Sequence, residues 1–216
     1  MALSNNSAAT KVFLNIIGGK ICRKTTKENP DAASRTNKNG ELIYELQYNS
    51  LKAKVKDLNI TEKEFKGEKT LNWEIVLSDV GEEYILQLPI SGRVTNGFLF
   101  RLPNVNLGEE IEIVTFLDKE KTDRTVLIVK QNGTTVKTAY TKDAPNGLPP
   151  LKSVMFKGKE QWDDTEQQFF IKEMVERTIK PKLKSLAPAA FASGVGASNE
   201  PPQADSNHDE SSDLPF

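Results

Sequence analysis

The chain has 216 residues, of which 37% are hydrophobic, 29 are basic and 30 are acidic, so its formal net charge is −1. That length is enough for one sizeable hydrophobic core. The single cysteine, Cys22, excludes an intramolecular disulfide and a cysteine-based zinc cluster.

The charges are distributed unevenly along the chain. The last basic residue is Lys184, and residues 185–216 hold five acidic residues. The first 184 residues therefore carry 29 basic against 25 acidic side chains, a net charge of +4. A mildly basic body attracts polyanions, and a tethered acidic segment competes with them.

The sequence offers little for catalysis. The only histidine, His208, lies in the acidic segment, so it cannot activate a nucleophile such as Cys22 within the folded body. Gly18-Gly19-Lys20 lacks the other residues of a phosphate-binding loop. We expect no enzymatic activity, no catalytic residue, no metal and no cofactor. Without a signal peptide or a long apolar run, the chain is expected to be soluble and cytoplasmic, with no membrane partner.

The first half of the chain predicts strands. An apolar run over 11–17 has strand length, and the polar, basic stretch 18–40 is expected to form a long mobile loop. The alternation over 42–48 places Tyr44 and Tyr48 on one strand face with two leucines.

Two more alternating segments follow. Residues 51–56 place Leu, Ala and Val on one face and three lysines on the other, and residues 71–77 place Trp73 on an apolar face, which favours a core position. A turn at 79–81 leads into a further strand over 83–89.

Two helices are expected among the strands. The apolar spacing between Ser91 and Pro103 predicts a helix capped by the serine and ended by the proline, although a strand through Phe98 and Phe100 is the alternative. A second helix begins at 163–165 and ends at Pro181. Its apolar stripe consists of Ile171, Val175 and Ile179.

The remaining strands lie between the helices. Residues 111–117 form one, and residues 125–131 and 134–140 form a hairpin around Asn132-Gly133, because that dipeptide favours a turn with positive φ at both positions. Many short strands with one helix between the middle strands and one after the last predict a mainly β fold. The expected architecture is an OB-fold-like Greek-key barrel with extra strands and one or two helices, and a β-sandwich is the alternative.

The composition changes at about residue 185. Ala, Pro, Ser, Gly and Asn dominate 185–207, which cannot bury enough apolar area to fold. We therefore expect a folded domain over 1–184 and a disordered linker with an acidic tail over 185–216.

The last residues of the sequence, Asp209-Glu210-Ser211-Ser212-Asp213-Leu214-Pro215-Phe216, combine acids with an apolar tip. They resemble the acidic tail of bacterial and phage single-stranded DNA-binding proteins, which ends in Ile-Pro-Phe. Leu214 replaces the isoleucine, and two serines dilute the acids. The resemblance implies a protein that coats single-stranded DNA during replication, recombination and repair. It also implies that the tail recruits a polymerase, helicase, primase or nuclease.

The tip has a physical rationale of its own. An apolar pocket rimmed by Arg or Lys can hold the ring and the carboxylate of Phe216 together, and Pro215 lowers the entropy lost on binding. The expected docking residues are Asp209, Glu210, Asp213, Leu214, Pro215 and Phe216.

Binding single strands without sequence preference needs basic side chains for phosphates and aromatic faces for bases. The residues of these types expected to contact nucleic acid are Lys24, Arg35, Tyr44, Tyr48, Lys52, Lys54, Lys56, Arg93, Phe100 and Arg101. The alternatives are a non-enzymatic phage adaptor or structural protein and a recombination mediator with a similar tail. A phage-encoded origin would place the protein in the host cytoplasm, and a homo-oligomer is compatible with the sequence.

Overall fold

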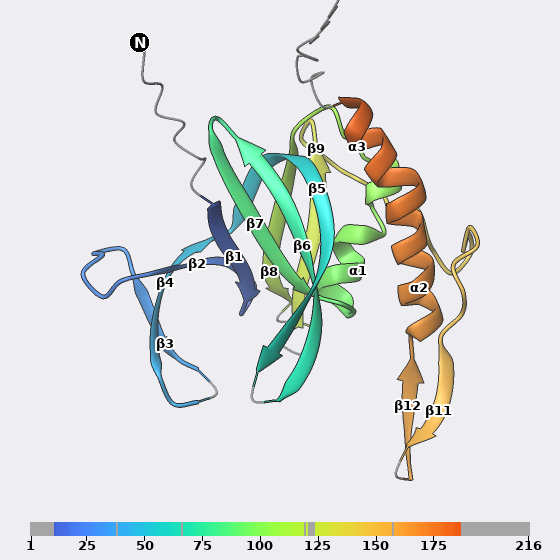
Figure 1. Cartoon of the computed structure of the whole chain (residues 1–216), viewed down its shortest axis with the longest axis horizontal. Helices are drawn as coiled ribbons and strands as arrows, with labels where there is room; N and C mark the ends of the chain where they lie inside the picture. The colour runs from blue at the N-terminus through green and yellow to red at the C-terminus, as the bar shows by residue number, and fades with distance from the viewer. Residues whose placement is uncertain are drawn as a thin grey trace, which may run out of the picture.

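A computed structural model describes residues 11–37, 39–65, 67–118, 120, 124–156 and 158–186. Ten strands form one mixed sheet in the order β10-β9-β8-β5-β6-β7-β1-β2-β4-β3, in which only β1 and β7 are parallel (Figure 1). Its strands are β1 (Lys11–Ile17), β2 (Lys20–Thr25), β3 (Ala33–Thr36), β4 (Leu42–Tyr48), β5 (Ser50–Phe65), β6 (Glu68–Asp79), β7 (Glu82–Pro89), β8 (Ile111–Asp118), β9 (Arg124–Gln131) and β10 (Thr134–Thr135). A separate hairpin consists of β11 (Lys152–Phe156) and β12 (Lys159–Asp163). The predicted mainly β class is confirmed.

The long strand β5 joins the two halves of the sheet. Its first residues, Ser50–Ala53, pair with β8, and the residues from Lys54 onward pair with β6. The register shifts between Val55 and Asp57, which leaves Lys56 as the extra residue of a β-bulge. A bulge bends the strand and increases its twist, so one strand can serve two neighbours in a curved sheet.

The predicted loop over 18–40 is wrong, because this stretch contains β2 and β3. Gly18 and Gly19 have φ values of 56° and 75° and turn β1 directly back into β2. The buried pair Ile21-Cys22 then contributes to the interior despite the polar residues that follow it.

The Gly18-Gly19 turn packs against another part of the sheet. The amide of Gly19 donates a hydrogen bond to Thr125 Oγ1 at 3.2 Å. A Cβ atom on Gly19 would lie 2.5 Å from the backbone nitrogen of Leu117. The turn between β1 and β2 therefore touches the ends of β8 and β9, so the sheet curls and brings distant strands together.

The predicted Asn132-Gly133 turn is confirmed, with φ values of 51° and 76°. The strand expected over 134–140, however, is only Thr134–Thr135. Side chains from the helical segment bind the backbone beyond it, because Arg101 Nε donates to the carbonyl of Val136 at 3.0 Å and Asn104 Nδ2 to that of Lys137 at 3.0 Å. These bonds replace further strand pairing.

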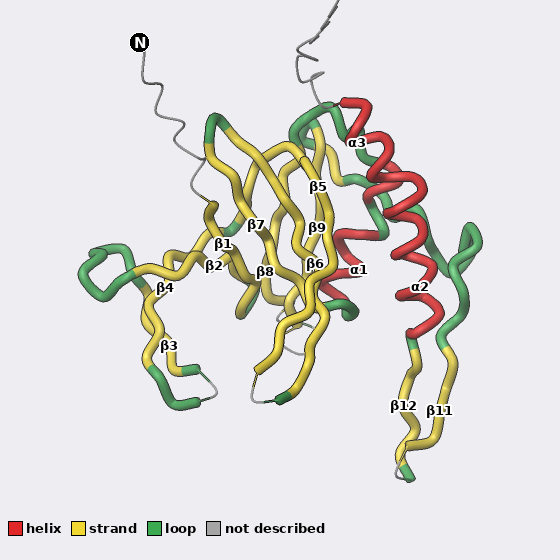
Figure 2. Tube along the Cα trace, viewed as in Figure 1, coloured by secondary structure: helices red, strands yellow, loops and turns green. Residues whose placement is uncertain are grey.

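The two predicted helices are present on one side of the sheet (Figure 2). The first, α1 (Arg93–Leu99), follows Gly92 at φ 117° and has no side-chain cap, so the predicted cap by Ser91 is wrong. A short 3₁₀ turn, η1 (Leu102–Asn104), follows it. Phe98 is buried in the core, as expected for a helical residue, and the strand alternative is excluded.

The second helix continues past its predicted end. It consists of α2 (Thr165–Met174), a π-helical turn η2 (Val175–Ile179) and α3 (Lys180–Leu186). Pro181 does not end it, because the wider π turn comes just before the ring that would clash with an ordinary α-helical backbone. The predicted stripe of Ile171, Val175 and Ile179 is buried.

The core lies between this helical layer and the inner face of the curved sheet. Trp73 is confirmed as a core residue at 2% exposure. Apart from Phe98, the other large, fully buried side chains are aliphatic and come mainly from β5, β6, β7, β8 and the helices: Ile21, Leu58, Ile75, Leu77, Leu86, Leu88, Leu99, Leu102, Ile111 and Ile113.

Candidate nucleic-acid interface

The residues expected to contact nucleic acid do not gather at one place. They lie on three surfaces and, in two cases, in half-buried positions that make internal contacts. The sheet register decides which of them share a face, because residues that pair across strands point to the same side.

Tyr44 and Tyr48 share one face of β4, as predicted. Cross-strand pairing puts Tyr44 beside Thr25 and Tyr48 beside Ile21 of β2, and Arg23 lies between them. Tyr48 remains 43% exposed. We define Arg23, Tyr44 and Tyr48 as the tyrosine surface; sequence reasoning missed Arg23 as its basic member.

A cleft of about 210 Å³ adjoins the tyrosine surface, and Arg23, Tyr48, Glu82 and Tyr84 line it. The hydroxyl of Tyr84 donates a hydrogen bond to Glu82, and this bond, more than its partial burial, raises the pKa of Tyr84 to about 12. The Glu82 carboxylate is therefore engaged by Tyr84, and Arg23 is the cationic side chain that lines the cleft.

Arg35 has a structural partner instead of a free guanidinium. It forms a bidentate pair with Glu45, through Nε to Oε2 at 2.9 Å and Nη2 to Oε1 at 2.7 Å. Glu45 is 5% exposed on the face of β4 opposite the tyrosines. The pair ties the edge strand β3 to β4, so Arg35 stabilises the fold rather than offering its charge to phosphate.

Cys22 lies beside this pair and is 2% exposed. Burial, with a further contribution from Glu45, raises the pKa of its thiol to about 11. The thiol is therefore protonated at neutral pH, which agrees with the expectation of a small buried residue and not a nucleophile.

Lys52, Lys54 and Lys56 are exposed on the outer side of β5, as predicted. Lys54 pairs with Ser78, Ser78 with Glu83, and Glu83 with Lys11. The lysines therefore belong to the outer face of the sheet and not to the tyrosine surface.

Phe100 and Arg101 are half-buried and make internal contacts, so the expectation that the Phe100 ring is freely exposed is wrong. Phe100 packs against the core and meets Tyr140 edge to face, with ring centroids 5.4 Å apart. Arg101 donates to the carbonyls of Val136 and Gly97, at 3.0 and 2.5 Å, and burial lowers its pKa.

The outer face of β1, β2 and β7 carries an aromatic side chain that sequence reasoning missed. Phe13 is 51% exposed, while its neighbours Val12 and Leu14 are buried. It pairs with Ile85, and Asn15 pairs with both Gln87 and Cys22. Because Lys24 follows Cys22 by two residues, it points to the same side.

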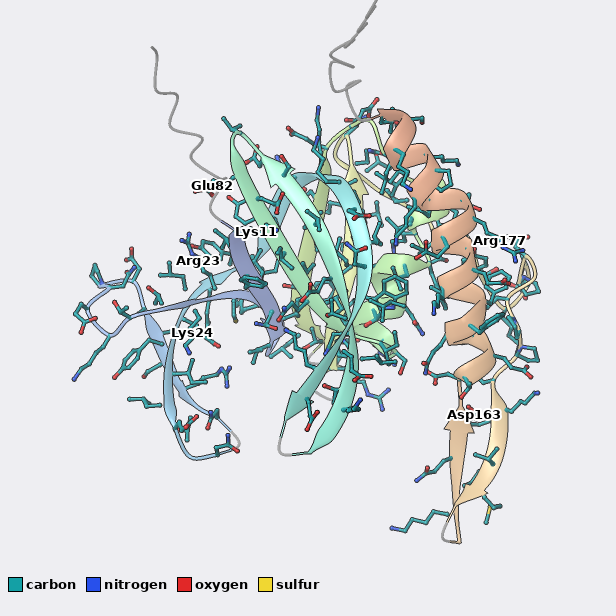
Figure 3. All side chains as sticks on the ribbon, in the orientation of Figure 1. Lys11, Arg23, Lys24, Glu82, Asp163 and Arg177 are labelled. Atoms are coloured by element: carbon teal, nitrogen blue, oxygen red, sulfur yellow. The ribbon has the colours of Figure 1, made fainter. Side chains whose placement is uncertain are left out.

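We define Lys11, Phe13, Asn15, Lys24 and Gln87 as the Phe13 surface. Figure 3 shows Lys11 and Lys24 on neighbouring strands at this part of the molecule. Three carboxylates on this face are engaged: Glu83 with Lys11 at 3.6 Å, Glu74 with Lys63 at 3.9 Å and with the Gln87 amide at 2.8 Å, and Glu45 with Arg35. Lys24 forms no ion pair with any residue that the structure describes.

A basic groove of about 400 Å³ lies at the end of β7, where α1 and β9 begin. Arg93, one of the predicted residues, and Arg124 line it together with Pro89, Ser91 and Thr125, and none of the lining residues that the structure describes is acidic. The Gly19 hydrogen bond to Thr125 places the end of β1 at the same edge. The arginine groove thus adjoins the strands that carry the Phe13 surface.

The predicted docking residues Asp209, Glu210, Asp213, Leu214, Pro215 and Phe216 lie outside the described residues. Within the described ranges, no group of three or more His, Cys, Asp or Glu side chains is arranged to hold a metal ion. No helix in that part of the chain is long and apolar enough to cross a membrane.

Comparison with known proteins adds no relative. No protein-family model, curated protein or solved structure matches the chain. The site must therefore be interpreted from its own chemistry.

Proposed function

We propose that the chain binds single-stranded DNA without strong sequence preference. The observation that carries the proposal is the Phe13 surface and its continuation into the arginine groove. An exposed aromatic ring on a sheet face offers a stacking platform for any base, and flanking lysines and arginines offer partners for the phosphates. Asn15 adds an amide group that can hydrogen-bond to base edges, whereas Gln87 Nε2 already donates to Glu74.

The strand order supports the same proposal. In an OB-fold, the face of the second and third strands binds oligonucleotides, flanked by the loops after the first and fourth strands. The proposal assigns β5, β6, β7, β8 and β9 to these five positions, because β5 pairs with both β6 and β8 and α1 lies between β7 and β8. The strand β1 adds to the binding side, because it pairs with β7. This insertion and the β2–β4–β3 extension depart from the simple barrel.

The test is fluorescence anisotropy with labelled oligo-dT and a duplex of equal length over a series of salt concentrations. We expect tighter binding to the single strand and a steep loss of affinity with salt, because counterion release drives much of the binding. Equal affinity for both nucleic acids, or binding that ignores salt, would reject the proposal and favour a structural or adaptor protein.

The second part of the proposal is that residues 209–216 recruit other proteins of DNA metabolism. It rests on the acids and the Leu-Pro-Phe tip in the sequence. Pull-downs from host lysate would compare the full chain, a variant without residues 209–216, and Phe216→Ala. We expect both changes to abolish the capture of a replication or repair protein; identical captures by all three proteins would contradict recruitment.

A further inference from the structure

The β11–β12 hairpin is a two-stranded sheet that projects from the body beneath α2 (Figure 1). Neither strand pairs with a third strand among the described residues. An isolated hairpin is marginally stable in water, and a free strand edge is a template for pairing with another chain.

The hairpin also exposes apolar side chains. Trp162 is 66% exposed and Met155 is 72% exposed. Their positions in the register, Ser153 opposite Trp162 and Met155 opposite Glu160, put both on one face. Phe169 on α2 and Leu151 before β11 are exposed as well. Association with another protein through this strand edge would bury the exposed Trp162 ring.

The charge pattern along β12 determines in which register β12 can pair with a second copy of itself. A strand that pairs antiparallel with its own copy about a two-fold axis places one residue opposite itself. If Lys159, Glu160 or Asp163 lay on the two-fold axis, it would face the same charge on the other copy. If Trp162 lay on the axis, Glu160 would face Asp164 of the other copy. Directly opposed like charges destabilise a strand pair.

Only Gln161 at the centre avoids every such conflict. In that register Lys159 of each copy faces Asp163 of the other copy, so two symmetry-related ion pairs form. The two Trp162 residues become diagonal neighbours whose backbone positions lie about 7–8 Å apart, so their long side chains can contact each other. The strand β11 has no such selectivity, because Lys152 is its only charged residue.

Asp163 remains available for this pairing. Its Oδ1 accepts hydrogen bonds from the amide and hydroxyl of Thr165, at 3.0 and 2.6 Å, and so caps α2. A carboxylate accepts further bonds through its second oxygen. Figure 3 shows Asp163 at the base of the hairpin, where the strand meets the helix.

We propose that two copies of this chain associate through β12, which forms a four-stranded sheet β11-β12-β12-β11 centred on Gln161. The contact is small, so the dimer is weak and concentration-dependent. The proposal is independent of DNA binding, since the hairpin contributes no residue to the Phe13 surface.

Sedimentation velocity of the full chain over a concentration series tests the charge pattern. We expect the wild type to self-associate and Lys159→Asp and Asp163→Lys each to sediment as monomers, because each change opposes like charges. An equimolar mixture of these two variants restores both ion pairs and should restore the dimer. Circular dichroism and melting curves check that Asp163→Lys, which loses the helix cap and sets a lysine opposite Lys152 within the hairpin, stays folded.

A cross-linking experiment tests the register without altering charge. Cys22 is buried, so a cysteine placed at the surface is the reactive one. We expect Gln161→Cys to form a disulfide-linked dimer on oxidation, and Thr178→Cys, at an exposed helix position, to do so far more slowly. A monomeric wild type, no rescue in the mixture, or equal cross-linking at both positions would overturn the proposal.

Discussion

Arg35 and Glu45 join the edge strand of the large sheet to its only neighbour through two hydrogen bonds of 2.9 and 2.7 Å. The arginine side chain is 32% exposed and the glutamate side chain is 6% exposed. A buried carboxylate is tolerated because a bidentate guanidinium satisfies it. The pair therefore explains how a charged residue is buried on the face of β4 that Glu45 shares with Lys24 of β2.

Replacing Glu45 by Gln should destabilise the protein. The change keeps the shape but removes the charge and turns an amide donor toward Arg35, so we expect a loss of about 1–3 kcal/mol in the free energy of unfolding. Urea unfolding measures it, and hydrogen exchange should locate the lost protection in β3. Glu62→Gln is the control, since its pair with Lys69 is exposed and worth under about 1 kcal/mol. Equal losses in the two variants would contradict the assigned role.

The Gly18-Gly19 turn gives a second stability prediction. Gly19→Ala meets both a positive φ and the backbone of Leu117, so we expect it to cost more than about 2 kcal/mol. Gly18→Ala has the same kind of φ but no atom within 4 Å, so only the conformational term of about 1 kcal/mol remains. Thermal unfolding of both variants measures the difference. Similar melting temperatures would mean that the close approach to β8 is not a constraint.

The Cys22 thiol predicts a change of stability with pH. Its pKa is raised from an ordinary 9.0 to about 11 in the folded chain. The unfolded chain therefore releases the proton first, and the thiol's contribution, fully present below pH 9, is lost as the pH rises towards 11. We expect the stability difference between wild type and Cys22→Ala to shift by on the order of 1–3 kcal/mol across this range. A constant difference would show that the thiol ionises freely.

Sequence patterns predicted the strands whose apolar and polar residues alternate, such as β4, β5 and β6, and they predicted the Asn132-Gly133 turn. They failed at β2 and β3, because Gly19, Ile21 and Cys22 are the only buried residues among those that the structure describes in the polar stretch 18–40. They also missed Glu45 as an interior residue, since its partner comes from a strand whose existence was not evident. Phe13 was hidden within an apolar run, and only the register shows that it points outward.

The arginine groove predicts a change in the salt dependence of DNA binding. The double variant Arg93→Ala/Arg124→Ala should weaken binding uniformly across sequences and flatten the logarithmic salt slope by about 1.4, at about 0.7 for each lost phosphate contact. The triple alanine variant of Lys52, Lys54 and Lys56 should flatten it too, because Lys54 lies in the same outer row as Lys11. Lys172→Ala/Lys182→Ala, on exposed helix positions, is the control and should leave the slope unchanged.

Phe13 and Tyr48 distinguish the two aromatic surfaces. If bases stack on the Phe13 surface, Phe13→Ala should cost about 1–3 kcal/mol of binding free energy, the usual contribution of one stacked base. Tyr48→Ala tests the tyrosine surface by the same measure, and we expect the smaller loss there, since the groove of Arg93 and Arg124 adjoins the other face.

Phe169→Ala is the matched control, because this ring is 64% exposed on α2 and away from both surfaces. Anisotropy titrations with oligo-dT, combined with melting curves to exclude unfolding, give the three affinities. A loss for Tyr48→Ala alone would move the bound strand to the tyrosine surface with Arg23. Wild-type affinity in all three variants would show that neither Phe13 nor Tyr48 stacks on bases, and the proposed function would lose its main support.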